Sequence, residues 1–229
     1  MARESEAPSA LLPTLLSLIA GSVDAIGFIG LGGLFTAHVT GNLVVLAAHA
    51  VAGEDASVAT MLSVPVFVSV LGLTRLLAGG LERLRVASLR PLLLAQFLLL
   101  CGFLALCVKA GPRIDPDTAH AIIAGMFGVS AMAVQNALVQ VSLEGSPPTA
   151  VVTTNLTRLT MDLGELLVGH DPIATARARE RAKQTWPAIA GFVLGCGLGA
   201  ACVAAAGLWS LALPTGLALI ALFVPPPRR

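Results

Sequence analysis

The chain has little charge and few aromatic side chains. Only 12% of its 229 residues are Asp, Glu, Lys or Arg, whereas 56% are hydrophobic, and tyrosine is missing altogether. Soluble domains carry roughly twice that charged fraction, so a water-facing globule is excluded. The 14 Lys and Arg residues nearly balance the 13 Asp and Glu residues. Without a basic surplus, no nucleic acid partner is expected.

Sequence signatures of catalysis, metal binding and disulfide bonding are also missing. The four cysteines lie in apolar runs without a Cys-x-x-Cys spacing, which is typical of small buried residues. No two histidines stand four residues apart, as a metal site on one helix face requires. The chain has no Gly-x-Ser-x-Gly or His-Glu-x-x-His motif. We therefore expect no catalytic residues, no metal and no cofactor.

The chain consists mostly of long apolar segments. A helix crosses the core of a bilayer with about 20 apolar residues. Six segments reach that length: 10–31, 57–79, 90–108, 118–142, 186–206 and 208–224. Two further stretches, 35–53 and 149–169, begin with polar residues. We predict an all-α integral membrane protein, a single membrane domain over 1–229 whose main partner is the lipid bilayer.

Basic residues gather in two loops, one between the second and third spans and one between the fourth and fifth. They are Arg75, Arg83, Arg85 and Arg90 in the first loop, and Arg177, Arg179, Arg181 and Lys183 in the second. Short loops of this kind stay in the cytoplasm, so an even number of crossings must separate them. A re-entrant 149–169 meets that condition. With 35–53 re-entrant too, both termini are cytoplasmic; a crossing 35–53 gives seven spans and an external N-terminus.

An internal repeat is the most specific signal in the chain. Residues 36–43 (TAHVTGNL) match residues 149–156 (TAVVTTNL) at six of eight positions. The chain thus divides into a first repeat, 10–110, and a second, 118–224, each with three spans and one polar-headed segment. Three crossings per half is an odd number, so we expect the halves to have opposite orientations. The predicted fold has about six transmembrane helices, two broken or re-entrant segments and an inverted 3+3 repeat.

Polar residues at and near the repeated motifs form the predicted binding site. A helix broken inside a membrane exposes N–H groups at a positive end, and such backbone is tolerated only where it is buried in protein or lines a wet cavity. An intramembrane carboxylate such as Asp24 is costly, so it couples a proton or cation or caps the break. The candidate solute-binding residues are Asp24, His38, Thr40, Gly41, Asn42, Gln135, Asn136, Thr153, Thr154 and Asn155. Alternatively, these side chains only satisfy the broken backbone or bridge helices.

Two other patterns concern helix packing and charge. Arg158 and Asp162 stand four residues apart and thus share a helix face, which predicts a buried ion pair or a gate on an anion path. Exposure at the cytoplasmic rim is the third alternative. Glycines at 191, 195 and 199 predict a close helix contact.

Several of these motifs together resemble a known family. They are GSVDAIGF at 21–28, FTAHVTGNL at 35–43, VQNA at 134–137 and the threonine-rich segment 149–157. With them the chain resembles the YoaK family of bacterial membrane proteins, known as domain of unknown function 1275, over residues 10–224. The resemblance implies an inner-membrane protein with about six helices and no established substrate. Thr154 stands where the family pattern leads us to expect Gly.

These observations favour a transport function. We expect a bacterial inner-membrane transporter or channel-like protein for a small polar or anionic solute, with its site near the midplane where the two motifs converge. A structural or regulatory membrane protein without transport is the alternative, and a membrane enzyme lacks the motifs it would need. The solute, the coupling ion, the direction of transport and any homo-oligomer are not fixed by the sequence.

Overall fold

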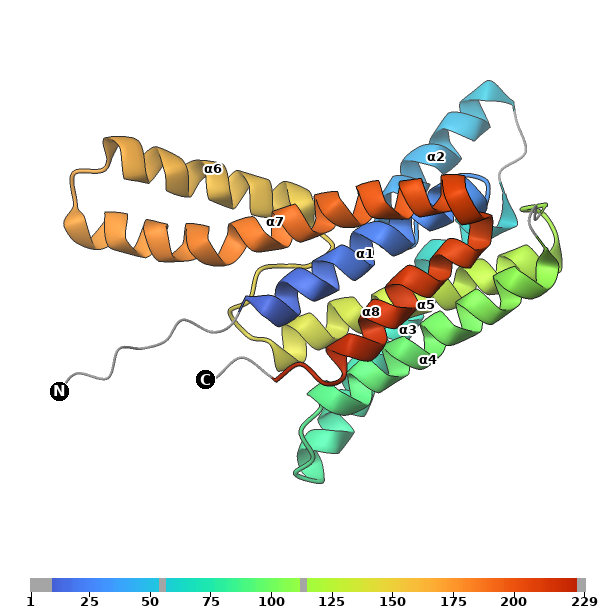
Figure 1. Ribbon diagram of the computed structural model, residues 1–229, viewed down its shortest axis with the longest axis horizontal. Coiled ribbons are helices and arrows are strands. Elements are labelled where there is room, and N and C mark those ends of the chain that lie inside the picture. The colour runs from blue at the N-terminus through green and yellow to red at the C-terminus, as the bar shows by residue number, and fades with distance from the viewer. Residues whose placement is uncertain (1–9, 54–56, 112–114, 226–229) are drawn as a thin grey trace.

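The computed structural model describes residues 10–53, 57–111 and 115–225, and within these ranges the chain is helical, with no strand (Figure 1). The helices are α1 (Leu11–Gly30), α2 (Val39–Ala52), α3 (Val58–Arg83), α4 (Leu89–Ala110), α5 (Ala119–Ser142), α6 (Val152–Val168), α7 (Pro172–Ala206), the 3₁₀ turn η1 (Gly207–Leu211) and α8 (Ala212–Ala221). The expectation of an all-α chain is therefore confirmed.

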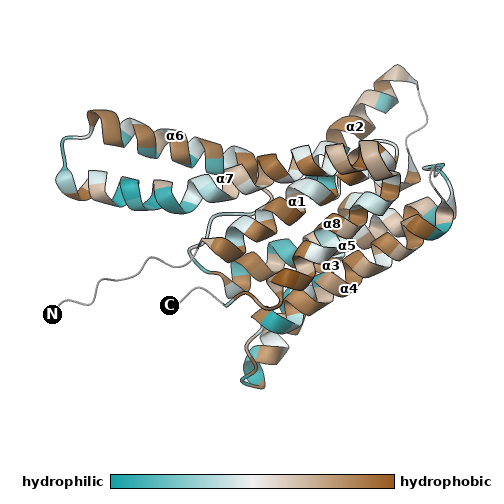
Figure 2. Ribbon diagram, viewed as in Figure 1, coloured by the Kyte–Doolittle hydropathy of each residue, from teal (hydrophilic) through white to brown (hydrophobic). Residues whose placement is uncertain are grey.

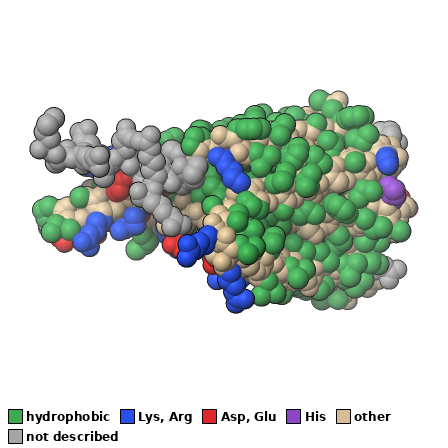
Figure 3. All heavy atoms as spheres, turned by 90° about the horizontal axis from the view of Figure 1, so that it is seen from below, with side chains coloured by type: hydrophobic (Ala, Val, Ile, Leu, Met, Phe, Trp, Pro, Cys, Tyr) green, Lys and Arg blue, Asp and Glu red, His purple; other side chains and the backbone are tan. Residues whose placement is uncertain are grey.

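Apolar helices of membrane-spanning length make up most of the described chain. Five helical stretches there qualify: α1, α3, α4, α5 and the run Pro172–Ala221 that contains α7, η1 and α8. Apolar side chains cover most of the body, and charged side chains gather mainly toward the end that holds α6 and the first half of α7 (Figure 3). This is the architecture of a membrane protein. The sixth expected span corresponds to η1 and the ten-residue α8, so the count of six stays a prediction.

Two helices form the centre of the molecule, and the others surround them. About two thirds of the residues in the apolar segment of α1 and of α5 are buried inside the protein, whereas only 17% of those in the apolar segment of α3 are buried. The helices α7 and α8 pack on α1, and α3 and α4 pack on α5. The expected close contact is confirmed for α1 and α7, because a Cβ added at Gly191, Gly195 or Gly199 would come within 2.8 Å of the α1 backbone.

A hairpin of α6 and the first half of α7 extends away from the helical body (Figures 1 and 2). The first half of α7 is hydrophilic, as its colour in Figure 2 shows. The structure corrects the expected ion pair between Arg158 and Asp162. Asp162 accepts hydrogen bonds from Nε of Arg181 on α7, at 3.0 Å, and from its Nη2, whereas Arg158 is exposed on α6. Asp162 is buried where α6 packs on α7, and its partner comes from α7.

Candidate functional site

Each repeated motif forms a non-helical segment that joins a central helix to a shorter one. The segments 31–38 and 144–151 have the same succession of turns and bends, and α2 and α6 begin at equivalent residues, Val39 and Val152. The residues that precede these helices have similar backbone angles, φ −93° and ψ 56° at His38, and φ −117° and ψ 75° at Val151. We call the segment 31–38 the first break and the segment 144–151 the second break.

The repeated asparagine closes both breaks in the same way. The Nδ2 group of Asn42 donates to the carbonyl oxygen of Phe35 at 2.8 Å, and that of Asn155 donates to the carbonyl oxygen of Pro148 at 2.6 Å. Both asparagines are buried. The pairing partner lies seven residues earlier in each case. The repeat in the sequence therefore encodes one local fold, formed twice.

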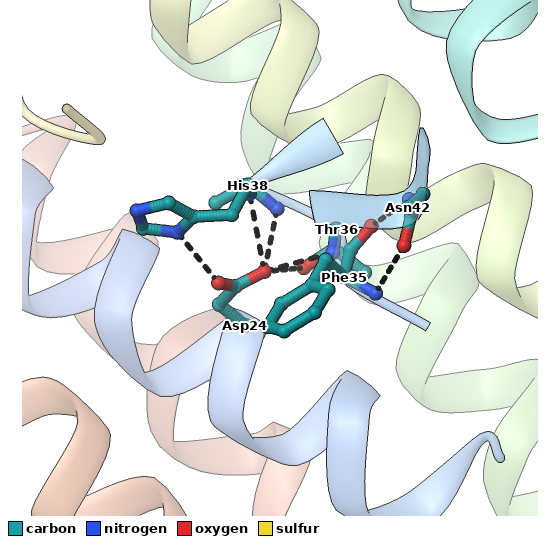
Figure 4. A network of polar contacts seen from close by, with 6 residues as sticks. Asp24, Phe35, Thr36, His38 and Asn42 are labelled. Carbon is teal, nitrogen blue, oxygen red and sulfur yellow. Dashed lines mark hydrogen bonds and ion pairs between the residues drawn. The ribbon is translucent and has the colours of Figure 1, made fainter. Parts of the chain in front are cut away.

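Asp24 holds the first break from inside the protein (Figure 4). Its Oδ1 accepts the backbone N–H groups of Thr36 and Ala37, both at 2.8 Å, and that of His38 at 3.3 Å. Its Oδ2 lies 2.8 Å from Nδ1 of His38. Only 5% of Asp24 is exposed. The carboxylate thus replaces the hydrogen bonds that the broken helix lacks.

Asn42 completes the first break with two more bonds. Its Oδ1 accepts the N–H of Phe35 at 3.0 Å, and its Nδ2 donates to Oγ of Ser63 on α3 at 2.8 Å. Ser63 in turn donates to the carbonyl oxygen of Thr60. The sequence interpretation missed Ser63, although a buried serine in a largely apolar helix is a signal for a polar partner.

The second break is tied to the core by glutamines. Gln135 on α5 donates to the carbonyl oxygen of Leu16 at 2.9 Å and to Oγ1 of Thr149 at 3.0 Å. It accepts a bond of 2.6 Å from Gln96 on α4, a residue that the motif search did not find. Because Gln135 reaches α1 and the second break together, it links the two halves.

The second break lacks a carboxylate. Asn136 is the counterpart of Asp24 when α1 and α5 are aligned at their last residues, Gly30 and Ser142, because Leu143 is an additional residue between α5 and the second break. Asn136 donates instead to the carbonyl oxygen of Met132 in its own helix, at 2.9 Å. Among the described residues, the backbone N–H groups of Thr149, Ala150 and Val151 have no acceptor. Oδ1 of Asn155 likewise has no donor there, because Pro148 has no N–H where Phe35 has one.

Aromatic rings surround the first break, and a cavity lies beside the second. The ring centroids of Phe28 and Phe35 lie 4.6 Å apart, and the ring of His38 is 6.5 Å from Phe35 and 5.2 Å from Phe192 of α7. The counterparts of Phe28, Phe35 and His38 are smaller or polar, and they line a cavity of about 370 Å³. They are Gln140, Pro148 and Val151.

The other predicted residues lie at the start of α2 and α6. A Cβ added at Gly41 would lie 3.0 Å from the ring of Phe35, which explains the glycine. Thr154 is the equivalent residue in the second half, where a proline replaces that ring. Thr40 and Thr153 are exposed on the surface of the described chain, so neither joins the buried polar groups.

Buried polar side chains connect both breaks to α1. Asp24 of α1 accepts a hydrogen bond from the first break. Gln135 of α5 donates both to Thr149 of the second break and to the carbonyl oxygen of Leu16 on α1. Eight residues separate these two positions on α1, which corresponds to about 12 Å along the helix axis. Buried polar groups from both halves therefore lie along the central part of one helix.

One comparison with known proteins identifies the family of the chain. The family model described as "Protein of unknown function (DUF1275)" matches residues 12–224. The chain belongs to the DUF1275 family. This confirms the resemblance seen in the sequence. Comparison with curated proteins and with solved structures gives no match, so the function of this DUF1275 protein has to be argued from its own residues.

Proposed function

We propose that this DUF1275 protein is a bacterial inner-membrane transporter or channel-like protein that moves a small polar or anionic solute past its two breaks. The observation that carries the proposal is that buried polar groups connect both breaks to α1, the first through Asp24 and the second through Gln135, at positions about 12 Å apart along the helix. Irregular backbone is tolerated in a bilayer where it is buried in protein or lines a water-filled cavity, and broken helices at a solute path are the second case.

The proposed membrane fold is an inverted 3+3 repeat with six crossings, and both termini are cytoplasmic. It is supported by the way each central helix packs on helices of the other half. The helix α1 packs on α7 and α8, and α5 packs on α3 and α4. In Figure 1, α1 and α5 run in opposite directions. In this fold α2 and α6 enter and leave on one side, each as part of a re-entrant segment.

Asp24 and His38 are the proposed coupling pair of the transporter. Their 2.8 Å contact joins an acid to an imidazole, and 36% of the His38 side chain is exposed, which gives the pair a route to the outside of the protein. Uptake or release of a proton by this pair would change the charge next to the first break. The same contact also supports the first break structurally.

A structural or regulatory membrane protein without transport is the second candidate function. It is supported by the bonds of Asp24 and Asn42, all of which close on the protein itself. The two candidates differ in one property: a transporter exposes its breaks to water, each from a different side at some stage of its cycle, whereas a scaffold keeps them protected.

Cysteine labelling of sealed, oriented vesicles distinguishes the two functions. The four native cysteines are first replaced by alanine. Thr40→Cys and Thr153→Cys are then introduced one at a time. Leu43→Cys and Leu156→Cys, three residues further along each helix, are the matched control variants. A membrane-impermeant thiol reagent is applied to one side at a time. We expect reaction of Thr40→Cys from one side and of Thr153→Cys from the other. Protection of both from both sides would overturn the transport proposal, and reaction of both from the same side would overturn the inverted repeat.

A further inference from the structure

We propose that one face of the hairpin formed by α6 and the first half of α7, residues 152–186, docks on the surface of a bilayer that contains anionic lipids. This face combines a row of leucines on α6 with basic residues on α7. Docking of the hairpin is compatible with transport and with a purely structural role, so it does not depend on the proposed function.

The α6 part of the face is apolar. Leu156, Leu163 and Leu167 lie seven and four residues apart, so they share one side of the helix. Their exposed fractions are 53%, 47% and 86%. An exposed apolar row of this length marks an interaction surface, because contact with water disfavours it. We call these three residues the leucine stripe.

The α7 part of the face is basic. Arg179, Lys183 and Trp186 lie four and three residues apart, and all three are exposed. They therefore form a second row along the hairpin, with the tryptophan at the end nearest the helical body. We call these three residues the basic stripe.

Both stripes lie on the same flank of the contact between α6 and α7, which are antiparallel (Figure 1). Asp162 and Arg181 bond to each other on the opposite flank. With 3.6 residues per turn, each stripe lies about 100° or more around its helix from the residue of that pair. The leucine stripe and the basic stripe are therefore side by side on one face of the hairpin.

The acidic residues of the hairpin lie elsewhere. Asp162 bonds to Arg181, and Glu165, one helical turn further on, interacts electrostatically with the same arginine. Glu180 accepts a hydrogen bond from a glutamine of α7, and Asp171 caps the start of α7 at the tip. These are the only acidic residues between 152 and 186. The face with the two stripes thus carries positive charge and no acidic side chain.

The hairpin begins at the level of the membrane surface. Trp186, a residue type enriched at membrane interfaces, separates the hydrophilic first half of α7 from its apolar second half (Figure 2). The register of the ion pair between α6 and α7 places Leu156 level with Pro187. Pro187 has no N–H for the helix ladder. The ladder is therefore interrupted where the hairpin would tilt toward the surface.

The composition of the face selects anionic lipid as its partner. Leucine side chains enter the boundary between headgroups and acyl chains, and basic side chains beside them attract anionic headgroups. Because α7 continues directly into an apolar helix of spanning length, the hairpin is always held close to the bilayer. The positive charge of Arg179 and Lys183 complements the charge of such a surface.

Docking is tested by measuring how close the hairpin tip comes to lipid headgroups in the full-length protein. His170 lies between α6 and α7, about 20 Å along α7 from Trp186. In protein whose native cysteines are alanine, His170→Cys carries a fluorophore. Vesicles consist of phosphatidylcholine with or without phosphatidylglycerol, and both contain a lipid with a nitroxide on its headgroup, which quenches a nearby fluorophore. We expect strong quenching only in the vesicles with phosphatidylglycerol.

Two double variants locate the face. Arg179→Gln with Lys183→Gln removes both charges of the basic stripe. Arg158→Gln with Arg177→Gln is the matched control, because these exposed arginines lie on the other flank. Each basic residue at an anionic surface strengthens binding about fivefold, so the ratio of quenched to unquenched protein should fall about tenfold or more in the first variant and little in the control. Equal unfolding midpoints in detergent show that both are folded.

Three results would overturn the proposal. The first is equal quenching with and without phosphatidylglycerol, and the second is an equal loss in both double variants. The third is energy transfer between donor-labelled and acceptor-labelled copies that does not depend on lipid charge, which would assign the face to a second copy of the chain. None of these readouts involves flux, so failure of docking is distinguishable from failure of transport.

Discussion

The first and second breaks share a backbone and differ in what fills them. Asn42 and Asn155 close the two segments with equivalent bonds. The first break then holds a carboxylate and packed rings, whereas the second has an amide, a proline and a cavity at the corresponding places. The repeat therefore preserves the asparagine that the backbone requires, and the side chains that line each break have diverged. The polar groups of the first break bond to one another, whereas the second break has a cavity beside it.

The largest difference between the halves is expected at the paired positions 24 and 136. Asp24→Ala removes the acceptor of three N–H groups and the partner of His38, and it should cost about 3 kcal/mol or more of the unfolding free energy. Asn136→Ala removes one bond to Met132 and should cost about 1 kcal/mol. Unfolding in mixed micelles measures both. Equal losses would show that Asp24 does not support the first break.

The two asparagines are expected to show the next largest difference in stability between the halves. Asn42 makes three hydrogen bonds, and Asn155 makes one while leaving an oxygen unsatisfied. We expect Asn42→Ala to destabilise the protein by about 2 to 3 kcal/mol and Asn155→Ala by about 1 kcal/mol. The same unfolding assay ranks them. A larger loss for Asn155→Ala would mean that the second break depends more on its asparagine than its bonds indicate.

The exchange of Gly41 and Thr154 tests the packing around each break. Gly41→Thr places a Cβ 3.0 Å from the ring of Phe35, and crowding of this kind costs about 1 to 3 kcal/mol. Thr154→Gly only adds flexibility to a helix and should cost about 0.5 to 1 kcal/mol. The double variant Gly41→Thr with Phe35→Ala is the control, because removal of the ring should abolish the crowding part of the loss. No relief in that variant would place the cause elsewhere.

The sequence was sufficient for those features that depend on local pattern. Apolar length predicted α1, α3, α4 and α5, and the glycines at 191, 195 and 199 predicted a close helix contact, whose partner the structure identifies as α1. The motif at 36–43 and 149–156 located both breaks. In each case residues close in the chain carry the signal.

Contacts between side chains on different helices could not be predicted from sequence patterns. The pairing of Asp162 with Arg181 depends on how α6 packs on α7, and helix spacing alone favoured Arg158. Gln96 and Ser63 became visible only through their contacts with Gln135 and Asn42. The cavity likewise arises because small or polar side chains meet where the first half has rings, and neither segment alone encodes it.

The smallest expected effect concerns the bond that the second break lacks. Pro148→Ala supplies an N–H opposite Oδ1 of Asn155, as Phe35 does for Asn42. The new bond contributes about 1 to 2 kcal/mol, and loss of the proline ring offsets about 0.4 to 1 kcal/mol by loosening the unfolded chain. Pro147→Ala carries the same loss without a new bond. We therefore expect Pro148→Ala to be more stable than Pro147→Ala by about 1 to 2 kcal/mol in the unfolding assay. If the two variants are equally stable, the unsatisfied oxygen of Asn155 costs the fold nothing, and the two breaks differ in stability for another reason.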